Sequence, residues 1–177
     1  MGLCSGASGG IGPIGEYYAI DLDVSELAVY GGLGEAMNTA IFYEYPPVLE
    51  YWELAAFSWD LTIETVGTSW VSEVSFGFMS GGESLVVAPG VGIDEPATVE
   101  LVQEPWITAG ALGLEALEFD LGTGMTLEIF DSFDDGDGVD AYFGVGSTFT
   151  MGFYIPSAGT GVVVLAGVGV VARRRRG

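Results

Sequence analysis

The sequence predicts an all-β protein: an antiparallel β-sandwich, jelly-roll-like, followed by a single C-terminal transmembrane helix. Apolar and polar residues alternate with a period of two in many short segments, which is the pattern of half-buried strands. The chain contains 29 glycines that separate these segments. No stretch before residue 155 shows helical periodicity. About ten short strands at a spacing of roughly 8–12 residues are typical of sandwiches.

The N-terminal third contains three predicted strands. Each combines β-branched or aromatic residues with polar neighbours, and the second and third end at glycine and proline, respectively. Val48 to Ala56 is interpreted as a helical turn or a loop, because its pattern fits neither period clearly. The predicted strands are Glu16 to Val24, Glu26 to Tyr30 and Met37 to Tyr45.

The middle of the chain has the clearest alternation. Phe57 to Val66 and Trp70 to Met79 are predicted to be strands, joined by a hairpin turn at Gly67 to Ser69. Large side chains at alternating positions of these strands are expected to lie in the core, because large aromatic residues are usually buried. These core residues are Trp59, Trp70, Phe76 and Phe78.

Six further strands complete the predicted sandwich. Met125 to Phe130 is expected to pair with the segment before it through the Gly122-Thr123-Gly124 turn. In the last strand, Phe149, Met151 and Phe153 alternate with smaller or polar residues. The six segments are Glu83 to Ala88, Thr98 to Val102, Glu115 to Leu121, Met125 to Phe130, Asp140 to Gly146 and Ser147 to Tyr154.

The charges divide the chain into unequal parts. All four basic residues are the arginines at 173–176, whereas all 25 Asp and Glu precede residue 155. We therefore expect a flexible lead-in at residues 1–15, a sandwich domain at 16–154 and a separate C-terminal signal at 155–177. A body this acidic repels nucleic acids and anionic lipids, so nucleic-acid binding is excluded.

The last segment has the composition of a membrane helix. Residues 155–172 are uncharged, and a spanning helix needs roughly 17–25 such residues. The arginines that follow predict that this end faces the cytoplasm and that the acidic domain lies outside. The alternative is a hydrophobic last strand with a solubilising basic end.

The order of a proline motif, a short apolar helix and an arginine cluster resembles the PEP-CTERM sorting signal of exported bacterial proteins. Pro156 matches the first proline of that motif, while Ser157 and Ala158 replace its Glu and second Pro, and Gly159 follows. The resemblance implies a transient stay in the inner membrane, cleavage near the motif by an exosortase, and release to the cell surface or matrix. The arginines that match the family's cluster are Arg173, Arg174, Arg175 and Arg176.

The N-terminus does not have the composition of a secretory signal. Residues 1–10 contain no basic residue and no apolar core. Because the C-terminal signal is meaningful only on an exported chain, we expect the true start to lie upstream, with a signal peptide that this sequence lacks.

An acidic loop supplies the candidate metal ligands Asp134, Asp135, Asp137 and Asp140. Aspartates at alternating positions with glycine turns can wrap Ca²⁺, although the spacing gives only part of an EF-hand loop. Calcium is therefore the candidate cofactor, and a plain solvated acidic loop is the alternative. No other cofactor is expected.

A group of aromatic residues near Pro46-Pro47 is the candidate sugar-binding surface, with core and loop packing as the alternative: Tyr43, Tyr45, Tyr51 and Trp52. Histidine is absent, and so is lysine, so a Ser-His pair and a phosphate-binding lysine loop are both excluded.

We expect a non-enzymatic, exported protein with a structural or adhesive role at the cell surface or in an extracellular matrix. Its expected partners are an exosortase and extracellular polysaccharide. The alternative is a carbohydrate-binding module or a secreted glycan-active enzyme on the same sandwich.

Overall fold

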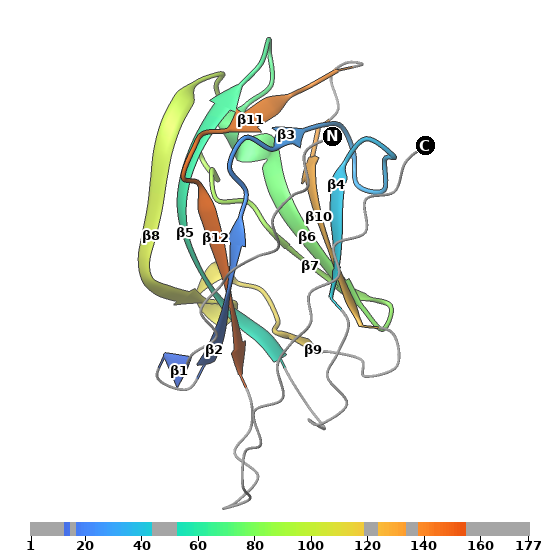
Figure 1. Cartoon of the computed structure of the whole chain (residues 1–177), viewed down its shortest axis with the longest axis vertical. Coiled ribbons are helices and arrows are strands. Elements are labelled where there is room, and N and C mark those ends of the chain that lie inside the picture. The colour runs from blue at the N-terminus through green and yellow to red at the C-terminus, as the bar shows by residue number, and fades with distance from the viewer. Residues whose placement is uncertain (1–12, 15–16, 44–52, 119–123, 134–137, 155–177) are drawn as a thin grey trace, which may run out of the picture.

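The computed structural model describes residues 13–14, 17–43, 53–118, 124–133 and 138–154. In these ranges the chain forms strands and two short 3₁₀ turns, so the all-β prediction is confirmed. The strands are arranged in two sheets (Figure 1). None of the described residues belongs to a helix long and apolar enough to cross a membrane.

The larger sheet has eight strands, and all of its pairings are antiparallel. Its strands follow the order β1-β2-β12-β5-β11-β3, with β8 and β9 paired to the other side of β5. Their bounds are β1 Pro13–Ile14, β2 Tyr17–Asp23, β3 Ala28–Val29, β5 Glu53–Thr65, β8 Thr98–Thr108, β9 Leu117–Glu118, β11 Ala141–Phe143 and β12 Thr148–Tyr154.

The smaller sheet has four strands in the order β4-β10-β6-β7, also antiparallel. Its strands are β4 Thr39–Tyr43, β6 Val74–Ser80, β7 Glu83–Val87 and β10 Met125–Asp131. The 3₁₀ turns are η1 at Val71–Glu73 and η2 at Gly110–Leu112.

The two sheets enclose one hydrophobic core between their inner faces. Phe149 of β12 stacks on Phe76 of β6 with ring centroids 4.1 Å apart. The rings of Phe57 of β5 and Phe78 of β6 are in contact, with their centroids 5.7 Å apart. All four side chains are fully buried, so aromatic residues from both sheets interlock at the centre. The arrangement is that of a β-sandwich.

The long strand β5 organises the larger sheet. Its burial alternates because successive side chains point to opposite faces. Along one edge it pairs with β12 and then with β11. These two strands lie in one line, interrupted at residues 144–147. At this break the amide of Gly144 donates to the carbonyl of Thr62 at 2.8 Å, and the hydroxyl of Ser147 accepts from the amide of Thr62 at 3.0 Å.

Several predicted strands are confirmed, with changed bounds. The strand predicted at Glu26 to Tyr30 is reduced to Ala28–Val29. The one predicted at Thr98 to Val102 continues through Thr108. Within Val48 to Ala56, the described residues Glu53 to Ala56 begin β5, so a helical turn is wrong there.

Two predicted connections are wrong. β5 and β6 do not form a hairpin, because β5 belongs to the larger sheet and β6 to the smaller one. The segment predicted to pair with Met125 to Phe130 contributes β9 instead, and β9 pairs with Glu53 and Leu54 of β5. In the described part of the chain, β10 lies between β4 and β6. In both places the short turn in the sequence indicated that the strands on either side of it are neighbours, but the chain passes there from one sheet to the other.

Candidate functional site

One end of the sandwich carries the acidic loop that supplied the predicted calcium ligands. Of these, Asp134, Asp135 and Asp137 lie outside the described residues. Asp140 is described and buried, with 4% of its surface exposed. Its amide donates to the carbonyl of Val29 at 2.9 Å, and its carbonyl accepts from Val66 at 2.7 Å. The hydroxyl of Ser69 donates to its Oδ1 at 3.3 Å.

The other end of this loop is anchored close by. Asp131 is fully buried, and its amide donates to the carbonyl of Tyr30 at 2.8 Å. Its Oδ1 accepts from the amide of Phe133 at 2.8 Å. Because Asp140 bonds to Val29 and Asp131 to Tyr30, both ends of the loop leave the sandwich beside the end of β3. Among the described residues no three acidic, histidine or cysteine side chains form a group that could hold a metal ion.

Trp70 lies on the same end, and the expectation that it belongs to the core is wrong. Its side chain is 42% exposed. The physical reason is the 3₁₀ turn η1, which breaks the period of two, so that the neighbouring Val71 is fully buried instead. The other three expected core aromatics, Trp59, Phe76 and Phe78, are buried as predicted.

The turn holds Trp70 in a fixed position. The amide of Trp70 donates to Oε2 of Glu73 at 2.7 Å, and the amide of Glu73 donates back to the carbonyl of Trp70 at 3.1 Å. The amide of Ser132 donates to the carbonyl of Glu73 at 2.9 Å, which connects the turn to the acidic loop. Phe133, the next residue, is 64% exposed. Two exposed aromatic residues, Trp70 and Phe133, thus lie close in sequence to the hydrogen bond that joins Ser132 to Glu73.

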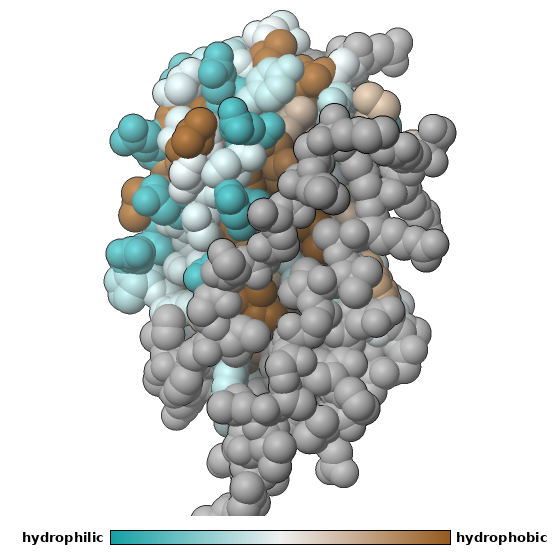
Figure 2. Space-filling view, in the orientation of Figure 1, coloured by the Kyte–Doolittle hydropathy of each residue, from teal (hydrophilic) through white to brown (hydrophobic). Residues whose placement is uncertain are grey.

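We call Trp70, Glu73 and Phe133 the loop-end surface. Tyr142 lies on β11, is 43% exposed and is in register with Glu64 of β5. At the top of Figure 2, near β11 and β3 of Figure 1, hydrophobic residues are interspersed among hydrophilic ones. Exposed aromatic rings next to carboxylate acceptors suit stacking and hydrogen bonding to a ligand rather than acid–base chemistry.

Of the aromatic residues predicted to bind sugar, the structure describes only Tyr43. Tyr45, Tyr51 and Trp52 lie outside the described residues. Tyr43 is buried in β4, with 4% of its surface exposed, so its ring is not available for stacking on a sugar. Within the described structure its hydroxyl has no hydrogen-bond partner, and burial raises the pKa of Tyr43 well above its usual value.

The residues of the predicted sorting signal lie outside the described residues. This applies to Pro156, Ser157, Ala158 and Gly159, and to Arg173, Arg174, Arg175 and Arg176. The signal therefore stays a prediction from the sequence.

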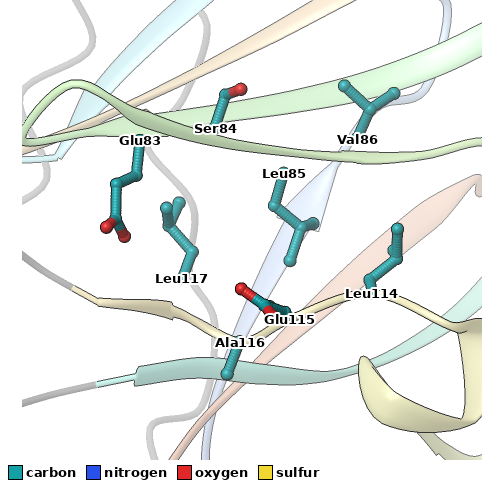
Figure 3. Close-up of a pocket in the computed structure, with 8 residues that line it drawn as sticks. All are labelled: Glu83, Ser84, Leu85, Val86, Leu114, Glu115, Ala116 and Leu117. Carbon is teal, nitrogen blue, oxygen red and sulfur yellow. The ribbon is translucent and has the colours of Figure 1, made fainter.

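A groove lies between β7 and the segment Leu114–Leu117 (Figure 3). Its volume is about 420 Å³. Leu85 and Leu117 are buried at its floor, whereas Glu83 and Glu115 are exposed. The sequence pattern does not indicate this groove, because its two segments are far apart in the chain and the pattern predicts that the second one pairs with β10. Only the position of Glu83 in phase with Leu85 and Val87 could have indicated a carboxylate on the inner side of β7.

Comparisons with protein-family models, with curated proteins and with solved structures found no match, so no relative supplies a function for this chain.

Proposed function

We propose that this chain is an exported protein of the cell surface or extracellular matrix, with a structural or adhesive role. The observation that carries the proposal is the separation of charge: 25 carboxylates precede residue 155, and all four basic residues follow an apolar segment as Arg173 to Arg176. This order fits a domain that leaves the cytoplasm and a basic end that does not. A PEP-CTERM-like signal, recognised by an exosortase, is the mechanism of sorting that we propose.

The finer architecture that we propose is jelly-roll-like, with the transmembrane helix at residues 155–172. The described chain passes repeatedly between the two sheets: β4 is in the smaller sheet, β5 in the larger, β6 and β7 in the smaller, and β8 and β9 in the larger. Such crossing connections are what a double-sheet jelly roll requires. A domain of this kind needs no disulfide, which agrees with the single cysteine in the sequence.

The sorting mechanism can be tested in a bacterium that expresses an exosortase. The wild-type chain, carrying an added secretory signal peptide, should first appear in the inner membrane and then at the cell surface. Mass spectrometry of the surface form should find a new C-terminus near Pro156. In a variant with Arg173 to Arg176 all changed to Gln, we expect less of the membrane-held form. A surface form that retains all four arginines would contradict cleavage.

A second candidate function, carbohydrate binding, is favoured by the exposure of Trp70. An aromatic ring that a hydrogen-bonded turn holds on the surface can stack on the apolar face of a sugar at little cost in conformational entropy. The repulsion from surrounding carboxylates disfavours anionic polysaccharides. Neutral polysaccharide is therefore the expected ligand, bound at the loop-end surface.

This second function predicts that Trp70→Ala removes most binding to neutral oligosaccharides on a glycan array. Phe133→Ala should weaken it less, because the hydrogen-bonded turn that holds Trp70 does not include Phe133. Leu112→Ala is the matched control, since Leu112 is 36% exposed on η2, which follows the opposite end of the β5–β8 pair. Equal binding by all three variants and the wild type would exclude the loop-end surface.

A further inference from the structure

The groove between β7 and Leu114–Leu117 combines an apolar floor with carboxylates on both sides. β7 is the last strand of the smaller sheet, and in the described structure it pairs only with β6. Across from it, the chain approaches β9, which pairs with the start of β5 in the larger sheet. The groove therefore opens where the edges of the two sheets separate, and the core residues Leu85 and Leu117 line it.

Glu83 lies on the core-facing side of β7. Leu85 and Val87, two and four residues further on, are 5% and 2% exposed, whereas Val86 between them is 39% exposed. Because side chains alternate along a strand, Glu83 points to the same side as Leu85. Figure 3 shows both side chains directed toward Leu114, Glu115 and Leu117. A carboxylate thus lies at the edge of a groove that has leucines on its floor.

Glu115 supplies a second carboxylate from the opposite side. It is exposed, and its neighbours Leu114 and Leu117 contribute apolar surface. The described residues contain no Lys, Arg or His, so no cation of this part of the chain can neutralise either carboxylate. The groove therefore offers two negative charges and a leucine-lined floor, but no positive partner of its own.

We propose that this groove binds a linear aliphatic diamine or polyamine. The ammonium groups would pair with Glu83 and Glu115, and the methylene chain would lie along Leu85, Leu114 and Leu117. The volume of about 420 Å³ is within the range of small-molecule sites. Charge complementarity excludes anionic ligands, and the apolar floor distinguishes an amine with a methylene chain from a simple metal ion.

Isothermal titration of the full chain, kept soluble in a non-ionic detergent at low salt, tests the proposal. The probes are 1,4-diaminobutane, 1,6-diaminohexane and 1,8-diaminooctane, with butylamine and Ca²⁺ as comparisons. We expect affinity to rise about two- to fourfold for each methylene that contacts the floor. Butylamine and Ca²⁺ should bind more weakly than the best diamine, and binding should weaken as salt increases.

Carboxamide variants locate the site. Glu83→Gln and Glu115→Gln keep the shape of two exposed side chains, so both should fold, which the melting temperature checks. Each should weaken diamine binding about three- to tenfold, and the double variant should weaken it further. Glu100→Gln is the matched control, because Glu100 is an exposed carboxylate on β8, away from the groove. It should bind like the wild type.

Three results would overturn the proposal. Affinity that does not depend on chain length would indicate pairing with surface carboxylates alone. An equal effect of Glu100→Gln and Glu83→Gln would show that no particular site is involved. Binding of a lysine-containing extended peptide without binding of any diamine would identify strand addition at the edge of β7 instead.

Discussion

We predict that Glu128 on β10 stabilises the protein by binding a loop to the outer face of the smaller sheet. It is 6% exposed, although it points away from the core between the two sheets. The loop at residues 31–38 covers it: the amide of Gly34 donates to Oε1 of Glu128 at 2.6 Å, and Nδ2 of Asn38 donates to the same oxygen at 2.7 Å. Asn38 also donates to the carbonyl of Gly32 at 2.8 Å, so this amide connects the loop to the sheet.

Replacing Glu128 by Ala leaves two donors without their acceptor. A hydrogen bond to a charged group contributes about 1.5–3 kcal/mol, but Gly34 is exposed and water can partly replace its acceptor. We therefore expect Glu128→Ala to lower the free energy of unfolding by about 2–3 kcal/mol. For a chain of this length that is a fall in melting temperature of roughly 5–10 °C. Glu128→Gln keeps an oxygen that accepts both bonds, so its expected cost is about 1 kcal/mol.

Urea unfolding followed by tryptophan fluorescence measures these differences, with Glu100→Ala on β8 as the control for loss of one exposed carboxylate. Hydrogen exchange adds a local measure, because the amide of Gly34 should lose protection in Glu128→Ala before the core does. The reasoning fails if the Gln variant is as unstable as the Ala variant, or if Glu128→Ala is no less stable than Glu100→Ala.

Three other variants test separate parts of the sandwich by the same unfolding assay. Phe149→Ala should cost about 3–5 kcal/mol, because the ring contacts Phe57, Trp59, Phe76 and Phe78 at the centre of the core; a cost below 1 kcal/mol would contradict this. Gly144→Ala should cost about 1–3 kcal/mol, since a Cβ there would lie 2.8 Å from Cβ of Thr62, and unchanged stability would mean that the break in the strand adjusts freely. Tyr43→Phe should be neutral or stabilising by about 1 kcal/mol, because it removes a buried hydroxyl that has no partner among the described residues. Burial raises the pKa of Tyr43, so at pH values above about 10 the phenol ionises in the unfolded chain before it does in the folded one, and the wild type loses stability as pH rises; Tyr43→Phe should lose less stability over this range.

The alternation of apolar residues predicted most strands because one face of each strand lies on a shared core. This is clearest in β12, where Phe149, Met151 and Phe153 are all buried as expected. The same signal could not give the pairing of strands. Gly67 to Ser69 has the composition of a hairpin turn, but here it leads from one sheet to the other. Local sequence determines where the chain turns, whereas the choice of sheet depends on contacts between distant segments.

Two other differences, in β8 and at Trp70, have local causes. The prediction ended a strand at Val102, whereas β8 continues past Pro105 to Thr108. A proline is compatible with β8 because Pro105 lies at the register shift of the β5–β8 pairing, where it has no partner residue in β5. Trp70 could not be placed correctly either. A three-residue 3₁₀ turn changes which neighbour is buried, and the sequence around Trp70 reads equally well as a continuous strand.

The candidate sites were predicted less well than the fold, and the reason is physical. Burial acts on every apolar residue and leaves a periodic pattern, whereas a binding surface needs only a few residues that depart from this pattern. Trp70 and Glu83 are such departures: an aromatic ring outside the core and a carboxylate on the inner side of a strand. An exposed ring gives up the free energy of burial, so the exposure of Trp70 costs stability that a buried ring would keep. Glu83 is exposed and keeps its solvation, so its place in phase with Leu85 is the departure from the pattern. The partners that we propose for these two residues are a sugar face at Trp70 and an organic cation at Glu83, since the described part of the chain contains no basic residue.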